Sequence, residues 1–304
     1  MTLRPPGGIA AEIAPAKVNL TLHVGGRRPD GYHNIESLVV FAGESDALRL
    51  TPARSLSLTV EGPFVVQCGP VEKNLITKAA HLLAQDVPGL SLGHFELTKN
   101  LPAAAGLGGG SSDAAATLRL LARLNELSLH DRRLQAVAAA VGADVPVCLD
   151  PAPRIMRGVG DVLSEPLALP PLHAVLVNPG IATATKDVFA AFDAMNADKP
   201  VEPAAATPLE KLSESALIAW LSEHSNDLES PAITLHPKIG DTLAALRAAP
   251  GCKLARMSGS GATCFGLFSE EGARAAAHML HSRHPDWWVR ATVFGENLDG
   301  NSPA

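Results

Sequence analysis

The chain has 304 residues, of which 46% are hydrophobic and 18% charged, and this length and apolar content allow two domains with buried cores. Its net charge of -6 at pH 7 argues against a nucleic-acid or anionic-membrane partner, because both attract basic surfaces, but a small substrate that carries phosphate is not excluded. The four cysteines form no CxxC pair, and the most apolar stretch is about half the roughly 20 residues that a membrane span needs. We therefore expect a cytoplasmic protein with reduced thiols, either a monomer or a weak homodimer.

Short segments rich in Val, Leu and Ile predict strands in the first part of the chain, at residues 17–24, 35–41, 47–51 and 56–60. A helix is predicted over residues 74–83, because Leu75, Ala79 and Leu82 fall on one face. A strand at residues 94–98 then runs into a glycine-rich segment. Apolar helices are predicted after it, at residues 112–127 and 134–141.

The pattern starts again after residue 164. We predict, in chain order, a strand at 174–177, a surface loop at 199–208, a helix at 239–248, a strand–turn–strand at 254–268, a helix at 271–281 and a strand at 288–293. Strands and helices without steady βαβ alternation favour an α+β fold over a doubly wound parallel sheet. We divide the chain into an N-terminal domain at residues 1–164 and a C-terminal domain at residues 165–304.

The segment PAAAGLGGGSSDAA at residues 102–115 is the strongest local signal for chemistry. Four of the five residues at positions 106–110 are glycine. Glycine permits unusual backbone conformations and lets a ligand approach the main chain closely. The helix that follows leaves N–H groups unpaired at its positive end, where anions bind. A simple helix cap at one of residues 111–113 is the alternative, but a cap does not require four glycines. The pattern is neither a P-loop nor GxGxxG, and we predict another kind of phosphate loop.

Three weaker motifs are ambiguous when each is taken alone. GADVP contains Asp144 in apolar surroundings, where an unused and unpaired carboxylate is costly, but a turn or cap aspartate fits as well. PAKVNL places Lys17 and Asn19 on one face of a predicted strand, which is often merely solvated. MSGSGATCFGLF at residues 257–268 predicts either a plain hairpin or a tight turn close to a ligand.

Together and in this order, the four segments resemble the motifs of the GHMP kinase family, named for galactokinase, homoserine kinase, mevalonate kinase and phosphomevalonate kinase. The resemblance extends from about residue 14 to residue 268 and also includes RPDGYH, NPGIATAT and SNDLE. It is closest to the member that phosphorylates a cytidine diphosphate-linked methylerythritol on the non-mevalonate route to isoprenoid precursors. It implies an ATP-dependent small-molecule kinase with a two-domain fold, namely a ribosomal protein S5 domain 2-like N-terminal domain and a ferredoxin-like C-terminal domain.

The resemblance also implies catalytic roles. Asp144 would be the general base at the 2-hydroxyl of the substrate, and Lys17 would lie close to it, keeping the carboxylate ionised and drawing the transferred phosphoryl group. Asn19 would bind the erythritol portion. Mg²⁺ would bridge the phosphates of ATP, although the metal ligands are not implied. The ATP-binding residues would be Pro102, Ala103, Ala104, Ala105, Gly106, Leu107, Gly108, Gly109, Gly110, Ser111 and Ser112.

The substrate's cytidine end would be held by residues from distant segments. Tyr32 would stack on the cytosine, His33 would hydrogen-bond it, and Phe189 would offer a second ring face. Because Tyr32 and His33 follow a Pro-Asp-Gly turn, they could also be ordinary surface residues. The remaining contacts implied by the resemblance are Thr185 to a substrate phosphate, and Gly259 and Gly261 to the substrate diphosphate.

Two alternatives remain at this point. The first is another GHMP member, either a different small-molecule kinase or an ATP-consuming decarboxylase. The second is a ligand sensor without catalytic activity on the same scaffold. The presence of both Lys17 and Asp144, together with the acidic net charge, disfavours such a sensor acting through a protein or DNA partner.

Overall fold

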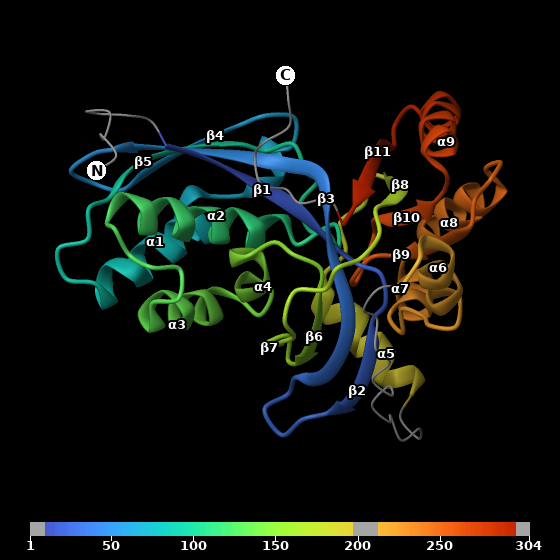
Figure 1. The fold of residues 1–304 in the computed structure, drawn as a ribbon, viewed down its shortest axis with the longest axis horizontal. Helices are drawn as coiled ribbons and strands as arrows, with labels where there is room; N and C mark the ends of the chain where they lie inside the picture. The colour runs from blue at the N-terminus through green and yellow to red at the C-terminus, as the bar shows by residue number, and fades with distance from the viewer. Residues whose placement is uncertain (1–9, 197–211, 296–304) are drawn as a thin grey trace. The chain divides into compact units, whose positions relative to one another are not determined.

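A computed structural model describes residues 10–196 and 212–295, which fold into two compact units (Figure 1). Unit 1 contains residues 10–16, 45–103 and 108–150, and unit 2 contains the other described residues. The surface loop expected at residues 199–208 lies outside the described residues, and the boundary at residue 164 stays a prediction. Within the described ranges, no helix is long and apolar enough to cross a membrane.

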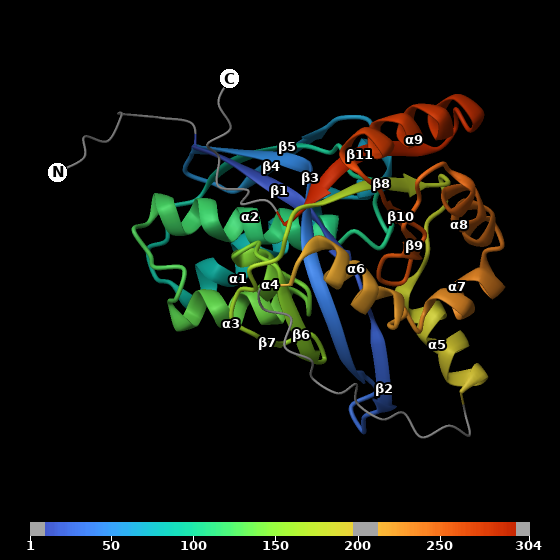
Figure 2. The same cartoon turned by 45° about the vertical axis from the view of Figure 1, so that its right-hand side comes forward.

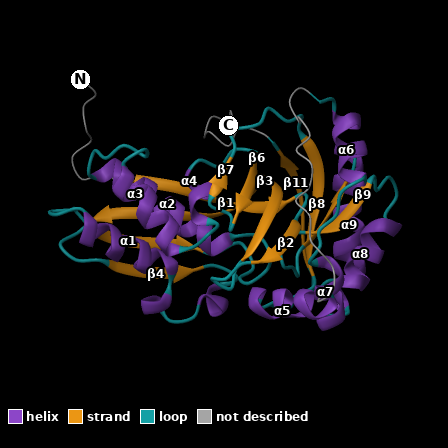
Figure 3. Cartoon of the chain, turned by 90° about the horizontal axis from the view of Figure 1, so that it is seen from below, coloured by secondary structure: helices purple, strands orange, loops and turns teal. Residues whose placement is uncertain are grey.

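Unit 1 places its helices on one face of a small sheet (Figures 1 and 3). In this sheet, the second half of β3 (His33–Pro52) runs antiparallel to β5 (Gly93–Thr98), and β5 runs parallel to β4 (Ser57–Glu61). The chain enters through β1 (Ala10–Asn19). The helical elements are η1 (Val65–Cys68), η2 (Val71–Lys73), α1 (Leu75–Asp86), α2 (Gly109–Leu124), α3 (Arg132–Val141) and α4 (Val145–Leu149).

The sequence explains why α1 packs as it does. Its buried residues, Ile76, Ala79, Ala80 and Leu83, repeat at the three- and four-residue spacing of one helix face. The side chain of Asn74 accepts a hydrogen bond from the N–H of Ile76 at 2.9 Å, which satisfies one of the free donors at the start of the helix. The helix then packs against α2 and α3, so α2 is held from the side.

Unit 2 is built on two groups of strands. The first half of β3 pairs antiparallel with β2 (His23–Arg27) and with β6 (Arg154–Gly158), and β6 pairs with β7 (Val162–Leu163). The other strands lie in the antiparallel order β11 (Trp288–Phe294), β8 (Leu172–Asn178), β10 (Cys264–Leu267) and β9 (Leu254–Met257). Its helices are α5 (Thr185–Met195), α6 (Glu214–Ser222), α7 (Glu229–Leu235), α8 (Lys238–Ala248) and α9 (Glu270–Arg283).

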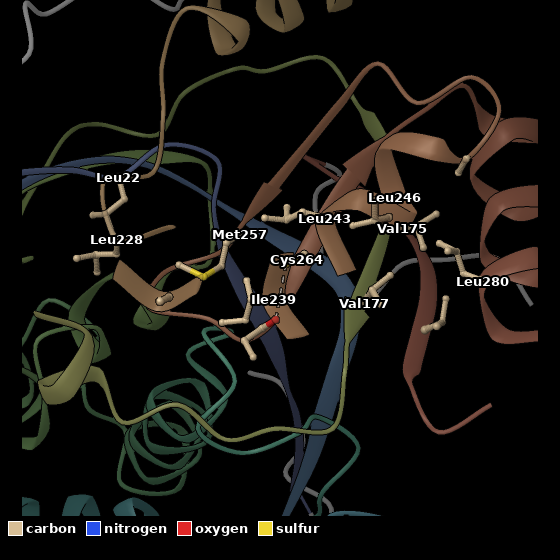
Figure 4. Packing of buried hydrophobic residues seen from close by; sticks show 14 of the residues in the cluster. Leu22, Val175, Val177, Leu228, Ile239, Leu243, Leu246, Met257, Cys264 and Leu280 are labelled. Atoms are coloured by element: carbon tan, nitrogen blue, oxygen red, sulfur yellow. Dashed lines mark hydrogen bonds between the residues drawn. The ribbon is translucent and has the colours of Figure 1, made fainter. Parts of the chain in front are cut away.

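Helices α8 and α9 contact the strands β8 to β11 and close the core of unit 2 (Figure 2). Figure 4 shows side chains from strands and helices meeting in this core. Val177 of β8, Met257 of β9 and Leu243 of α8 are all fully buried there. The apolar faces of β8 and α8 therefore fix the positions of the turns at the ends of these strands.

Most expected elements occur, but two expected strand boundaries were wrong. The expected strands at 35–41 and 47–51 are one continuous strand, β3, because Asp46 lies buried within it instead of in a turn. The carboxylate of Asp46 accepts the backbone N–H groups of Asn100 and Leu101, so its polar atoms are satisfied inside the sheet. The expected strand at 17–24 breaks after Asn19, because the N–H of Leu22 donates to the carbonyl of Ser225 and not to β3.

Several short helices were not expected. Helix α4 begins within GADVP, at Val145, and α5, α6 and α7 lie between the expected strand at 174–177 and the expected helix at 239–248. These helices are short or begin next to proline and polar residues, so their periodicity is weak. The first turn of α2 also begins three residues earlier than expected, at Gly109. This last difference matters for the phosphate loop, because it places glycines inside the helix.

Candidate functional site

The glycine-rich segment begins α2 without a capping side chain. Gly108 adopts the left-handed conformation at the N-cap, with φ of 60°, and no side chain there caps the first turn. Ser112 does not cap the helix, since its Oγ donates to the carbonyl of Pro15 at 2.6 Å. Asp113 does not cap it either, because its carboxylate binds Lys99 at 2.6 Å. The simple cap is therefore excluded as an explanation of this segment.

The first turn of α2 keeps free donors. Within the described ranges, the backbone N–H groups of Gly109, Gly110 and Ser111 have no hydrogen-bond partner. The first N–H in the helix with a backbone partner is that of Ser112, which donates to Gly108 at 2.9 Å. Three free N–H groups at the positive end of a 16-residue helix can bind a phosphate.

A variant of Gly110 tests this turn without disturbing the fold. A Cβ at this position would meet only Leu75 Cδ1, at 3.5 Å, which is an ordinary contact. Helical Cβ atoms tilt toward the N-terminus, and a β-branched side chain there would crowd the free N–H groups. We expect Gly110→Val to raise KM for ATP at least about tenfold, or about 1.4 kcal/mol of binding. Steady-state kinetics at varied ATP, with thermal unfolding as the check of folding, would reveal an unchanged KM if the turn does not bind phosphate.

Three distant segments of unit 2 meet at one place. The N–H of Asn19 donates to Ser258 Oγ at 3.1 Å, and Ser258 Oγ donates to the carbonyl of Gly106 at 2.8 Å. The N–H of Lys17 donates to the carbonyl of Leu107 at 2.8 Å. The approach is so close that a Cβ on Gly106 would lie 2.2 Å from the Ser258 carbonyl oxygen. The expected PAKVNL and SGSGATCFG segments are thus brought together with residues 104–107.

Lys17 and Asn19 are buried polar residues and not members of a solvated strand face. Their side chains are 4% and 3% exposed, respectively. Lys17 Nζ donates to Asn19 Oδ1 at 3.0 Å, and Asn19 Nδ2 donates to Ser37 Oγ at 2.7 Å. A buried ammonium and amide must be satisfied, so their positions are tightly fixed.

Two residues that sequence reasoning missed secure the turn at 257–263. Asn226 Nδ2 donates to the carbonyls of Met257, at 2.8 Å, and Gly259, at 2.7 Å. Thr183 Oγ1 donates to the carbonyl of Gly261, and its N–H donates to the carbonyl of Ala104 at 3.0 Å. Asn226 belongs to the SNDLE block and Thr183 to NPGIATAT, so both residues lie in motifs that the sequence showed, but neither residue had a role assigned.

The two glycines of the turn at 257–263 differ in the bonding of their backbone N–H groups. The N–H of Gly261 is bonded to the Ser258 carbonyl at 3.0 Å, whereas that of Gly259 has no partner among the described residues. Thr185 Oγ1 lies 2.9 Å from Ser260 Oγ, so the start of α5 meets this turn. Thr185 therefore lies next to the turn that contains Gly259 and Gly261, and the binding of a ligand by these residues stays a prediction.

The expected base-binding residues also come together within unit 2. His33 is 8% exposed, and its ring stacks on Phe189 with centroids 5.1 Å apart and planes 26° apart. Its Nε2 lies 2.7 Å from Asp193 Oδ1, a partner that sequence reasoning missed. Tyr32 differs, because it is 62% exposed. The binding of a base by Tyr32, His33 and Phe189 stays a prediction.

Asp144 lies directly before α4 and is half-buried. It occupies the N-cap position, but its side chain makes no capping hydrogen bond. The carboxylate is therefore not explained by helix capping, one of the two alternatives that the sequence left open. No structural fact tests its catalytic role, which stays a prediction.

A buried charge cluster behind the phosphate loop was not expected. Lys99 Nζ binds Asp46 Oδ2 at 2.5 Å and Asp113 Oδ2 at 2.6 Å, and all three side chains are at most 4% exposed. Asp113 Oδ1 is buried without a hydrogen-bond partner among the described residues. Burial raises the pKa of Asp113 to about 7, because desolvation and the charge of Asp46 outweigh the ammonium. Burial lowers the pKa of Lys99, but the two carboxylates together hold it above its ordinary value.

The cluster predicts a pH-dependent stability. Between the ordinary pKa of 3.8 and about 7, folded Asp113 keeps a proton that the unfolded chain releases. The folded state binds more protons in this window, so the free energy of unfolding falls as pH rises. Asp113→Asn cannot titrate and should lose this fall, gaining up to about 1.4 kcal/mol per pH unit relative to wild type. Urea unfolding from pH 4.5 to 7.5 measures the difference.

Asp131 provides the matched control for this experiment. Hydrogen bonds with Arg133 lower the pKa of Asp131 to about 2. Any stabilisation that this aspartate gives is therefore lost only as the pH falls below 3.8, the ordinary pKa of the group. Asp131→Asn should therefore leave the slope between pH 4.5 and 7.5 as in wild type. If the free energy of unfolding has the same pH dependence in wild type and Asp113→Asn, the Asp113 carboxylate is not protonated in the folded protein.

An apolar surface lies next to the start of the phosphate loop in unit 1. Val66 is 92% exposed, and Val65 and Val71 are each more than a third exposed. In the same segment, Gln67 Oε1 accepts the N–H of Ala103 at 2.8 Å. The sequence signal was GPFVVQ, a pair of valines in a polar, proline-containing stretch.

Comparisons with known proteins agree with this arrangement. The family model described as GHMP kinases N terminal domain matches residues 74–150, and the one described as GHMP kinases C terminal matches residues 205–286. A curated protein of Methylobacterium radiotolerans, named 4-diphosphocytidyl-2-C-methyl-D-erythritol kinase, is 54% identical over 94% of this chain and 99% of its own length. A protein of the same name from Bradyrhizobium sp. is 53% identical over 94% of this chain and 96% of its own length.

Solved structures extend the comparison to the fold. A crystal structure of 4-(cytidine 5'-diphospho)-2C-methyl-D-erythritol kinase is 34% identical to this chain, with a TM-score of 0.76 over 95% of this chain and 100% of that one. The family models and this likeness confirm the expected α+β GHMP kinase-like fold.

Proposed function

Because this chain belongs to the GHMP kinase family and is an ATP-dependent small-molecule kinase, we propose that it phosphorylates the 2-hydroxyl of 4-diphosphocytidyl-2-C-methyl-D-erythritol. The proposal would place it on the non-mevalonate route to isoprenoid precursors. The observation that carries the choice of substrate is the buried imidazole of His33, which stacks on Phe189 and follows the exposed Tyr32 in the chain. The names of its relatives at more than 50% identity support the same substrate.

The first turn of α2 is proposed to hold the phosphates of ATP. The free N–H groups at residues 109–111 supply donors, and catalysis of phosphoryl transfer rests mainly on positioning and charge stabilisation. The exposed Val65 and Val66 offer the adenine an apolar surface beside the loop. Kinase Mg²⁺ is bound by one or two carboxylates together with the substrate phosphates, and the described ranges hold no preformed cluster of three or more metal-binding side chains. This fits a Mg²⁺ that arrives with the nucleotide.

The acceptor side is proposed to use Asp144, Lys17 and Asn19. The Asp144 carboxylate would take the proton of the 2-hydroxyl as the oxygen attacks the γ-phosphorus. The Lys17 ammonium would stabilise negative charge on the transferred group. Asn19 has one N–H beyond its bond to Ser37 with which to hold the erythritol portion.

The substrate diphosphate would meet the turn at 257–263. The free N–H of Gly259 is the donor there, whereas that of Gly261 is already bonded within the turn. Thr185 adds a hydroxyl from the start of α5. Backbone and hydroxyl donors of this kind are frequent partners of phosphate oxygens.

A single assay tests the proposal. ADP formation is measured with the purified protein, Mg²⁺ and ATP against the cytidine substrate, mevalonate, homoserine and galactose. We expect ADP with the cytidine substrate alone, and ³¹P spectra of the product should place the new phosphate on the 2-oxygen. ADP with another alcohol would point to a different kinase, release of CO₂ to a decarboxylase, and binding without ADP to a sensor.

A further inference from the structure

Helix α5 presents on one face three residues that each contact Ser260 or His33. Thr185, Phe189 and Asp193 follow each other at four-residue intervals, so their side chains project from the same side of the helix. Thr185 meets Ser260, Phe189 stacks on His33, and Asp193 binds His33. The first two belong to the proposed substrate site. Asp193 has no role in the function proposed above.

The imidazole of His33 is held in one orientation. Phe189 covers one face, and the Phe192 ring stands edge-on with centroids 6.1 Å apart and planes 89° apart. The Nε2–Asp193 Oδ1 contact of 2.7 Å then fixes the rotation of the ring in its plane. A ring flip would break this contact and bring a carbon to the carboxylate, so the side chain has one stable placement.

The same contact decides which ring nitrogen carries the proton. An ionised carboxylate can only accept a hydrogen bond, so Nε2 must donate. In the neutral imidazole, Nδ1 then keeps a lone pair and can only accept. Nδ1 has no hydrogen-bond partner among the described residues, and it is not among the buried unpartnered atoms. Arg27 Nη1 lies 3.8 Å from the other oxygen of Asp193.

We propose that Asp193 is a positioning residue that holds His33 in the Nε2–H tautomer, so that Nδ1 accepts a hydrogen bond from the exocyclic amine of a cytosine. The inference rests on the proposed function for the identity of the ligand. At the same place, uracil presents a carbonyl oxygen, which would face the Nδ1 lone pair. The carboxylate therefore gives the pocket its preference for an amino-bearing pyrimidine without touching the base.

The tautomer can be measured without any substrate. Long-range ¹H–¹⁵N spectra of protein with ¹⁵N-labelled histidine distinguish a protonated Nε2 from an unprotonated Nδ1. We expect a clean Nε2–H pattern for His33 in wild type and a mixture of tautomers in Asp193→Ala, assigned with His33→Ala. Asp193 has a side chain 34% exposed on a helix surface, so the alanine variant should fold, and thermal unfolding verifies it.

Kinetics then connect the tautomer to specificity. The ratio of kcat/KM for the cytidine substrate to that for its uridine analogue should fall at least about tenfold in Asp193→Ala, since a buried acceptor without its donor is costly. The change should lie in KM, with kcat almost unchanged. Asp193→Glu, which keeps an acceptor carboxylate, should recover part of the ratio.

Asp187→Ala is the matched control. It removes an exposed carboxylate from the first turn of the same helix, so it reproduces the change in net charge near an anionic substrate. Its ratio should equal that of wild type. An Asp193→Ala variant with wild-type tautomer and ratio would overturn the inference while the kinase proposal stands. A wild type without activity on the cytidine substrate would instead overturn the proposed function, and the spectra would still report on the Asp193–His33 pair.

Discussion

Asp144→Asn should lower kcat about 10²–10⁴-fold, the range that loss of a general base typically gives. The amide has nearly the shape of the carboxylate but cannot take the proton of the substrate hydroxyl. Because the Asp144 side chain does not cap α4, the exchange removes no helix-stabilising hydrogen bond at that position. KM for ATP and for the cytidine substrate should therefore change little. Initial rates at saturating concentrations of both substrates measure the effect.

The control for this prediction lies at the other end of α4. Asp150 follows α4 and is exposed, and its exchange for Asn should leave kcat within about twofold of wild type, as is usual for surface positions. Thermal unfolding of both variants verifies that the fold is intact. A folded Asp144→Asn variant that keeps more than about a third of kcat would make this aspartate structural, since base catalysis contributes far more.

The second large effect concerns the base of the substrate. Cytosine presents an amine donor and a ring acceptor where uracil presents the reverse, so uridine leaves two groups of the pocket unpaired. At about 1–3 kcal/mol for each such group, kcat/KM should favour the cytidine compound roughly 30-fold to more than 1,000-fold. His33→Ala should erode this preference, because it removes the oriented Nδ1 acceptor.

Tyr32 separates stacking from hydrogen bonding. Stacking on an exposed aromatic ring stabilises cytosine and uracil alike, so Tyr32→Ala should weaken both substrates to a similar degree. Tyr32→Phe keeps the ring and should behave as wild type. Equal kcat/KM for the two substrates in wild type would remove His33 from the specificity pocket and reopen the choice among GHMP kinases.

The fold and the motifs could be predicted in part from the sequence, for reasons that particular residues make clear. The long helices α2 and α9 occur close to where they were expected, and the buried residues of α9, Ala273, Ala276 and Leu280, keep the spacing of one helix face. Asp46 accounts for one wrong strand boundary, because an acidic residue close to Gly43 suggests a turn, and its partner Lys99 lies 53 positions away. Pairing over such a distance leaves no local signal.

The residues of the candidate site could likewise be identified from the sequence only in part. Lys17, His33 and Phe189 could be singled out by motif, and the structure supplies neighbours for each of them. Asp193 and Thr183 could not, because a helical aspartate or a loop threonine has many ordinary explanations. Their significance lies in the atoms they face, Nε2 of His33 and the carbonyl of Gly261, and these contacts exist only in the folded chain.

The order in which this protein is synthesised bears on the strand that carries Lys17. Asn19 bonds to Ser258, 239 positions later, and Leu22 pairs with Asn226, all within unit 2. The ribosome therefore exposes Asn19 and Leu22 long before these two partners exist, and contacts of such long range form slowly. A fragment that ends at residue 164 would lack those partners altogether, with unpaired strand edges open to aggregation. We expect the nascent chain to bury its Lys17 strand only when nearly the whole polypeptide has emerged.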